Sequence, residues 1–181
     1  MSDKLWVREA VMEDREVIWH WWNDPMTRKM MKRNEYVPWE EHCAWFEGVL
    51  HDDDRILCVG LLGSERFGVV RFDLKGDRIY EVSINLKPAF RGKGLASQIL
   101  EASINYLLTK RSVRKLFATL KKINVPSMKA FARAGFVYAE NLIVDHAGLE
   151  RFDPESELYC EQFFERPKCL TIPWSTGLGR E

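Results

Sequence analysis

The sequence of 181 residues has no apolar run long enough to span a bilayer and no excess charge of either sign. Its 27 basic side chains equal its 27 acidic ones, so no global field would recruit nucleic acid or an anionic membrane. No basic and apolar leader follows Met1, and we therefore expect the protein in the cytoplasm. The length predicts one domain over residues 1–165, followed by a C-terminal tail over residues 166–181.

Cysteine is also sparse, and the sequence shows neither an internal repeat nor a low-complexity tract. The four cysteines lie at positions 43, 58, 160 and 169, without the spacing of a metal site. A chain of this size needs no disulfides to be stable. We therefore predict buried thiols in a reducing cytoplasm, and no metal ion.

Two common phosphate-binding motifs are absent from the glycine-rich segment 91–96. A Walker loop requires Gly-Lys-Ser/Thr, but Gly94 is followed by Leu95. The dinucleotide fingerprint requires a third glycine or alanine, and Ser97 stands at that place. A nucleoside triphosphatase loop and a dinucleotide fold are thus both disfavoured.

What the sequence does contain here is a strand, a glycine-rich turn and a helix. Residues 81–86 alternate between polar and apolar, which predicts a strand with one packed face. Pro88 ends it, because proline has no N–H for a ladder, and residues 95–107 carry apolar side chains at helical spacing. Such a junction presents free backbone N–H groups and a helix N-terminus to an anion.

The turn itself has the composition of a phosphate cradle. Gly92 and Gly94 lack the Cβ atoms that would hold a phosphate at a distance. Arg91 and Lys93 are expected to add positive charge at the same place.

The remaining pattern predicts an α+β domain with a mixed sheet. Strands are predicted at residues 4–10, 56–62, 66–74, 78–86, 115–120, 136–139 and 158–164. Helices are predicted at residues 13–22, 27–33, 38–50, 95–107 and 124–135. The apolar strand at 158–164 is expected at an edge of the sheet, where it would allow a homodimer.

The spacing of Arg91, Gly94 and Ala96 resembles the pyrophosphate loop Q/R-x-x-G-x-G/A of the GNAT superfamily, the acyl-CoA-dependent N-acyltransferases. The resemblance covers most of the chain and is strongest over residues 81–135. It implies a three-layer GNAT fold, with a mixed and mostly antiparallel sheet flanked by helices, and acetyl-CoA as cofactor. The coenzyme-binding residues that it implies are Ser83, Ile84, Asn85, Leu86, Arg91, Gly92, Lys93, Gly94, Leu95, Ala96, Asn124, Ser127, Phe131 and Arg133.

Acetyl transfer to an amine requires a base, because an alkylammonium has a pKa near 10.4 and attacks only when neutral. Glu81 is the candidate, on the polar face of the central strand; otherwise it is a solvated sheet carboxylate. The departing thiolate also needs a proton. Many relatives have a tyrosine where this chain has Phe131, which has no proton to donate. Tyr138, Tyr106, Ser83 or a water remain as candidates.

The predicted acceptor region is rich in tryptophan and in basic residues. Its patterns are W-x-N-D-P-x-x-R at 21–28, P-W-E-E-H-x-x-W-F at 38–46 and V-R-F-D at 70–73. They resemble the N-acetyltransferases of nucleotide-linked amino sugars in pseudaminic acid-type pathways. Aromatic faces would stack a base or sugar, and cations would bind its diphosphate. The acceptor-binding residues predicted on this basis are Trp22, Asn23, Arg28, Trp39 and Arg71.

Other acceptors stay open. Asn-Asp-Pro with a downstream arginine also occurs in acetyltransferases for protein N-termini and aminoglycosides, although the basic segment 28–33 disfavours a polycationic aminoglycoside. A protein N-terminus, another small amine, or a non-catalytic acyl-CoA-binding module are the alternatives. We interpret Trp21 and Trp45 as core anchors, and His20 and His42 as surface or capping histidines.

Overall fold

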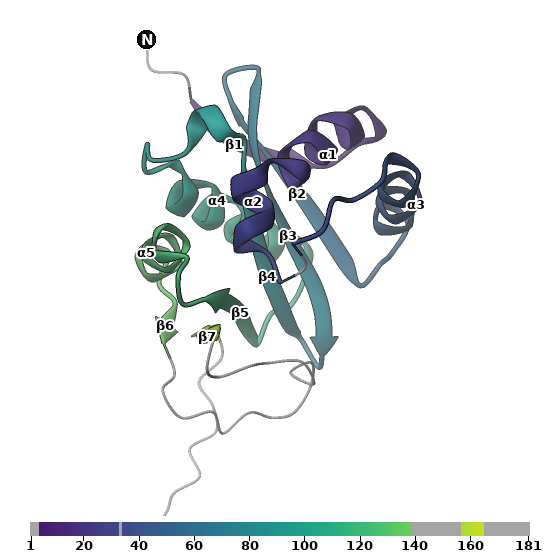
Figure 1. The fold of residues 1–181 in the computed structure, drawn as a ribbon. Helices are drawn as coiled ribbons and strands as arrows, with labels where there is room; N and C mark the ends of the chain where they lie inside the picture. Colours follow the sequence, from purple (N-terminus) through teal and green to yellow (C-terminus); the bar gives the residue numbers. More distant parts are fainter. Residues whose placement is uncertain (1–3, 33, 139–156, 165–181) are drawn as a thin grey trace, which may run out of the picture.

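The computed structural model describes residues 4–32, 34–138 and 157–164, and its framework is a seven-stranded mixed sheet in the order β1-β2-β3-β4-β5-β7-β6 (Figure 1). The strands are β1 (Leu5–Glu9), β2 (Arg55–Leu62), β3 (Glu65–Gly76), β4 (Ile79–Leu86), β5 (Lys115–Lys121), β6 (Val137–Tyr138) and β7 (Glu157–Phe163). Neighbouring strands pair antiparallel except β4 and β5, which are parallel. The predicted α+β class with a mixed, mostly antiparallel sheet is confirmed.

Helices cover both faces of this sheet. They are α1 (Arg15–Asn23), α2 (Pro25–Met30), α3 (Trp39–Leu50), α4 (Leu95–Lys110) and α5 (Val125–Arg133), with 3-10 turns η1 (Met12–Asp14) and η2 (Pro88–Phe90). Figure 1 shows α1 and α3 on one side of the sheet and α4 and α5 on the other. No helix within the described ranges is long and apolar enough to cross a bilayer.

The second helix begins earlier than the sequence predicted. The sequence predicted helices at residues 13–22 and 27–33, but Asp24 and Pro25, which follow the first helix, already start the second. The Asp24 carboxylate accepts a hydrogen bond from the Thr27 N–H at 2.9 Å, and Pro25 occupies the first helical position. One short segment therefore ends α1 and caps α2, which sets the angle between them.

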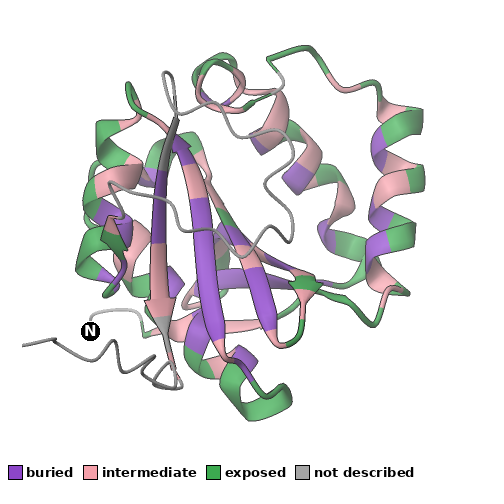
Figure 2. Cartoon of the chain, turned by 90° about the horizontal axis from the view of Figure 1, so that it is seen from below, coloured by how far each residue is buried: buried purple, intermediate pink, exposed green. Residues whose placement is uncertain are grey.

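Alternation along the strands builds two hydrophobic cores, one on each face of the sheet, and the buried residues concentrate along its central strands (Figure 2). Val70, Phe72 and Val82 face α4 and α5. Leu57 and Val69 face α1 and α3. Odd and even positions of β3 thus serve different layers.

The expectation that strand 158–164 forms an edge is wrong. β7 lies between β5 and β6 and pairs with both. Its residue Cys160 lies opposite Ala118 of β5 and opposite Tyr138 of β6. The reason given for a homodimer therefore fails.

Of the cysteines, Cys58 and Cys160 are buried and Cys43 is partly buried. Cys169 and the predicted tail lie outside the described residues.

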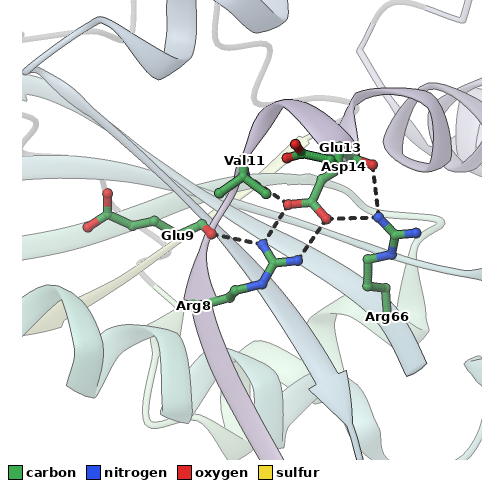
Figure 3. Close-up of polar contacts among 6 residues, drawn as sticks. All are labelled: Arg8, Glu9, Val11, Glu13, Asp14 and Arg66. Carbon is green, nitrogen blue, oxygen red and sulfur yellow. Dashed lines mark hydrogen bonds and ion pairs between the residues drawn. The ribbon is translucent and has the colours of Figure 1, made fainter. Parts of the chain in front are cut away.

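A buried carboxylate ties the entrance of α1 to the sheet (Figure 3). Asp14 is fully buried and accepts two hydrogen bonds from Arg8, at 2.6 and 2.9 Å. It also accepts one from the Val11 N–H at 2.9 Å and one from Arg66 at 3.1 Å. Burial by itself would raise the pKa of the Asp14 carboxyl, but these hydrogen bonds hold it below its ordinary value. The cluster thereby joins β1, η1 and β3.

Replacing Asp14 by Asn is expected to lower the free energy of unfolding by about 2 kcal/mol at pH 7, because it leaves two part-exposed guanidinium groups without their counter-charge. The stabilisation from a carboxyl with a lowered folded-state pKa is present above its unfolded pKa and is lost as the pH falls through the folded-state value. The difference between wild type and variant should therefore shrink in acid. Urea titrations at several pH values measure this, with the exposed Asp53→Asn as control. A difference that stays the same in acid would contradict the assignment.

Candidate active site

The central feature of the candidate site is a gap between two neighbouring strands. β4 and β5 pair only at Ile79 with Lys115, Tyr80 with Leu116 and Glu81 with Phe117. Beyond these pairs the strands diverge, and the backbone of residues 82–86 has no ladder partner on this side among the described strands. A cleft of about 460 Å³ lies there, within the range of small-molecule sites.

The cleft collects side chains from both halves of the chain. Its lining residues are Trp22, Thr27, Met30, Met31, Lys32, Glu35, Val37, Glu41, His42, Trp45, Leu57, Val69, Arg71, Glu81, Val82, Ser83, Ile84, Asn85, Thr119, Leu120, Lys121, Asn124, Ser127 and Phe131. Thirteen of them come from α1–α3, from the segment between α2 and α3, and from β2 and β3; eleven come from β4, β5, and α5 with its N-cap Asn124. Two layers of the fold therefore meet at one opening.

The glycine-rich loop at the end of β4 has the geometry of an anion cradle. Gly92 and Gly94 have φ angles of +73° and +74°, in the left-handed region that favours glycine. A Cβ atom built on either residue would meet no atom within 4 Å, so the space in front of the loop is open. Gly94 is the N-cap of α4, a helix of 16 residues whose first N–H groups have no intrahelical partner. This arrangement fits the diphosphate of coenzyme A.

The side chain of Arg91 does not contribute charge to this loop as expected. Its guanidinium donates to Asp24 Oδ2 at 2.7 Å, to Thr27 Oγ1 at 2.6 Å and to the Leu86 carbonyl at 3.2 Å. The guanidinium is therefore paired with the Asp24 carboxylate at the N-terminus of α2. Lys93 lies over the Phe90 ring, with Nζ at 5.1 Å from the centroid.

The start of α5 closes the other side of the cleft. Asn124 caps the helix by accepting a hydrogen bond from the Ser127 N–H at 3.2 Å, and both residues line the opening. Phe131 is fully buried at the floor and packs edge-on against Phe136, with 4.9 Å between centroids. Arg133, in contrast, is exposed in the last turn of α5 and does not line the cleft.

Of the four candidate catalytic side chains, the structure brings two together. Glu81 and Ser83 lie on the same face of β4 and both line the cleft, and the Glu81 carboxylate forms an ion pair with Lys75 at 3.4 Å. Tyr138 is elsewhere, because its hydroxyl donates to the Met128 carbonyl at 2.6 Å. Burial raises the pKa of Tyr138 to about 12, so it gives up this proton reluctantly. Tyr106 bonds Glu9 at 2.8 Å, also away from the cleft.

The predicted acceptor residues divide in the same way. Arg71 and Trp22 line the cleft, and the Arg71 guanidinium carbon lies 5.9 Å from the Trp22 ring and 5.8 Å from the Trp45 ring. Trp45 is thus a cleft residue as well as a core residue. Arg71 is also ion-paired with Asp73 at 3.0 Å.

Three of the predicted acceptor residues do not line the cleft. Asn23 holds the loop before α3, accepting from the Val37 N–H at 2.9 Å and donating to its carbonyl at 3.0 Å. Trp39 stacks against His42, and the guanidinium carbon of Arg15 lies 5.2 Å from the centroid of the Trp39 ring. Arg28 is not a lining residue of the cleft.

The interpretation of His42 as a surface or capping residue is wrong. The ring is fully buried among aromatic side chains of α1 and α3 and borders the cleft. Its Nε2–H donates to the Arg15 carbonyl at 2.8 Å, and burial lowers the pKa of the imidazole, which is therefore neutral at pH 7. The spacing Trp39, His42, Trp45 and Phe46 on one helix face was the signal that could have placed it inside.

Comparison with known proteins agrees with this geometry. The acetyltransferase (GNAT) domain family matches residues 4–137. YnaD of Bacillus subtilis, an uncharacterized N-acetyltransferase, is 21% identical over 144 residues, which cover 74% of this chain and 79% of YnaD. YwnH of the same organism, provisionally named a phosphinothricin acetyltransferase, is 29% identical over 140 residues, 72% of this chain and 82% of YwnH. The spermidine N-acetyltransferase of Vibrio cholerae, solved with CoA and spermine, has the same fold, with a TM-score of 0.74 at 17% identity over 88% of this chain and 95% of that one.

Proposed function

The chain belongs to the GNAT acetyltransferase family and is an acetyl-CoA-dependent N-acetyltransferase of amines, and from this premise we propose that its acceptor is the 4-amino group of a nucleotide-linked amino-dideoxy sugar. The observation that carries the proposal is the position of Arg71 beside the adjacent rings of Trp22 and Trp45, whose centroids are 4.4 Å apart. A nucleotide diphosphate requires a cation, and its base or sugar requires aromatic faces. Arg71 and the two tryptophan rings lie on the side of the cleft that holds Glu81.

Glu81 is the proposed base. It takes the proton of the bound alkylammonium, whose pKa of about 10.4 would otherwise keep the amine charged at neutral pH. Acetyl-CoA supplies the acetyl group as a thioester, so a carbon–nitrogen bond forms, the carbon–sulfur bond breaks and the sulfur needs a proton. Phe131 has no proton to give, and Ser83 is the remaining side chain among the predicted donors that lines the cleft. We therefore assign Ser83, directly or through a water, to the departing sulfur.

The coenzyme would be held by backbone groups more than by charge. The diverging segment 82–86 offers ladder groups to the amides of the pantetheine arm, and the loop with Gly92 and Gly94 offers N–H groups to the diphosphate. Asn124 and Ser127 lie across the gap.

A polyamine is the second candidate, and a specific observation favours it. Glu35 and Glu41 line the same cleft and would attract a second ammonium group. The spermidine acetyltransferase that shares the fold was solved with such a molecule. A peptide N-terminus, which needs no second charge, is the third.

Thiol release from acetyl-CoA should be measured with UDP-linked 4-amino-dideoxy sugars, spermidine, phosphinothricin, kanamycin and peptides, with mass spectrometry of each product. We expect kcat/KM to be at least about tenfold higher for a nucleotide sugar, because it alone offers a diphosphate to Arg71. Arg71→Ala should raise the KM of that substrate about tenfold and leave the KM of amines without phosphate unchanged. Arg111→Ala, on the far end of α4, is the control. Preference for spermidine or a peptide would overturn the proposal.

A further inference from the structure

A chain of hydrogen bonds joins the coenzyme loop to the acceptor side of the cleft. Arg91, the first residue of the loop, donates to Asp24 Oδ2 and to Thr27 Oγ1 at 2.7 and 2.6 Å. The Thr27 hydroxyl lies 3.2 Å from the Oδ1 atom of Asn85 on β4. Asp24 also accepts the Thr27 N–H at 2.9 Å, so Thr27 is held from two directions. The loop, α2 and β4 are thus connected through side chains that are partly or fully buried.

The structure assigns a direction to each of these bonds. A guanidinium only donates, so the Thr27 oxygen accepts from Arg91. In the structure the Thr27 hydroxyl donates its proton to the amide oxygen of Asn85. The Asn85 amide is therefore oriented by the chain, with its Nδ2 group turned away from Thr27.

That Nδ2 group is a donor without a partner. It is shielded from solvent and has no hydrogen-bond acceptor in the part of the chain that the structure describes. Leaving a buried donor unpaired costs about 1–3 kcal/mol, and native proteins rarely keep one without a functional reason. Asn85 lines the cleft, so a bound molecule can supply the missing acceptor.

The position of Asn85 indicates which bound molecule this is. Asn85, Ser83 and Glu81 lie opposite Val69, Arg71 and Asp73, so their side chains project to the face that carries α1 and α3. The coenzyme arm would lie in the plane of the sheet, between the diverging backbones of β4 and β5. A donor that projects out of this plane faces the acceptor, on the same side as Arg71 and Trp22.

We propose that Asn85 Nδ2 donates a hydrogen bond to an oxygen atom of the acceptor close to the reacting amine, and that Thr27 and Arg91 are positioning residues that orient this amide. The inference rests on the proposed transfer to an amine bound on this face. It narrows the acceptor class, because a sugar or an amino acid carries hydroxyl, ether or carbonyl oxygens near its amine. A polyamine carries none.

Two substitutions test the donor and its orientation separately. Asn85→Ala should raise the KM of the nucleotide amino sugar about tenfold and leave the dissociation constant of acetyl-CoA unchanged. Thr27→Val keeps the shape of the side chain but removes the hydroxyl, and should raise the same KM about threefold. In the Asn85→Ala background it should have no further effect on the KM, because its action passes through Asn85. The exposed pair Asn105→Ala and Thr109→Val on α4 are the matched controls.

The outcomes separate the alternatives. Weaker acetyl-CoA binding with an unchanged acceptor KM would assign the donor to the coenzyme and overturn the proposal. Additive effects of the two substitutions would overturn the positioning role of Thr27.

A readout without turnover uses the side-chain amide resonances of Asn85 in 15N-labelled protein, identified by their loss in Asn85→Ala. A shift on adding the UDP-linked amino sugar to the acetyl-CoA complex supports the proposal. No shift, or a shift with acetyl-CoA alone, overturns it. This titration decides the inference even if no amine of the panel is acetylated. The absence of acetylation would instead count against the proposed function.

Discussion

Replacing Glu81 by Gln is expected to lower kcat/KM for amine acetylation about a thousandfold at pH 7, with acetyl-CoA affinity unchanged. General base catalysis contributes typically about 10²–10⁴-fold, and an alkylammonium with a pKa near 10.4 leaves almost no neutral amine at this pH. Glutamine keeps the size of the side chain and loses the basic oxygen. The carboxylate lines the cleft and is held by Lys75 at 3.4 Å, so the substitution acts on the reaction more than on the fold.

The dependence on pH makes this test sharper. As the pH rises, solvent deprotonates more of the amine and the variant should recover part of its activity, so the ratio of wild type to variant should fall. Glu101→Gln, on the exposed face of α4, is the control. Activity of Glu81→Gln within threefold of the wild type at pH 7 would show that Glu81 is only a solvated sheet carboxylate.

Replacing Gly94 by Val is expected to weaken acetyl-CoA binding about 100-fold, equivalent to about 2.8 kcal/mol. Two effects add. The φ angle of +74° is strained for any residue with a Cβ atom, by about 1–2 kcal/mol, and more for a β-branched one. The new side chain would also occupy the open space in front of the loop, where the diphosphate needs direct access to the N–H groups.

Gly48→Val is the matched control for this prediction. A Cβ atom at Gly48 also meets nothing within 4 Å, but Gly48 lies inside α3, with no left-handed φ and outside the cleft lining. Isothermal titration with acetyl-CoA measures both variants. If Gly94→Val binds acetyl-CoA as the wild type does, coenzyme A does not bind at this loop.

Most of the secondary structure was predictable because strands and helices carry their own periodicity. The alternation over 81–86 identified β4, its buried face and the face with Glu81. The errors arose where one signal has two meanings. Asp24 and Pro25 end one helix and start the next, and an apolar strand such as β7 looks the same at an edge and in the interior of a sheet.

The candidate site shows the same division between local patterns, which the sequence predicts, and packing, which it does not. The Asn124 cap and the loop with Gly92 and Gly94 were predicted because their geometry depends on residues adjacent in sequence. The lining of the cleft on the side of α1 and α3 was predicted only in part. Trp22 and Arg71 line the cleft, and so do Trp45 and His42, which were interpreted as a core anchor and as a surface or capping residue. Whether a helix residue faces the core or a cleft depends on how α1 and α3 pack on the sheet.

The sequence by itself determined a glycine-rich loop with left-handed glycines, a strand with a carboxylate on its open face and the α+β class, since each is a short-range pattern of backbone and side-chain preferences. Only the tertiary structure decided what Arg91 binds. Its partner Asp24 is 67 residues away along the chain, and their contact exists because α2 packs beside the end of β4. The guanidinium that the local motif assigned to phosphate is paired inside the protein with Asp24, and it also donates to Thr27, whose hydroxyl contacts Asn85.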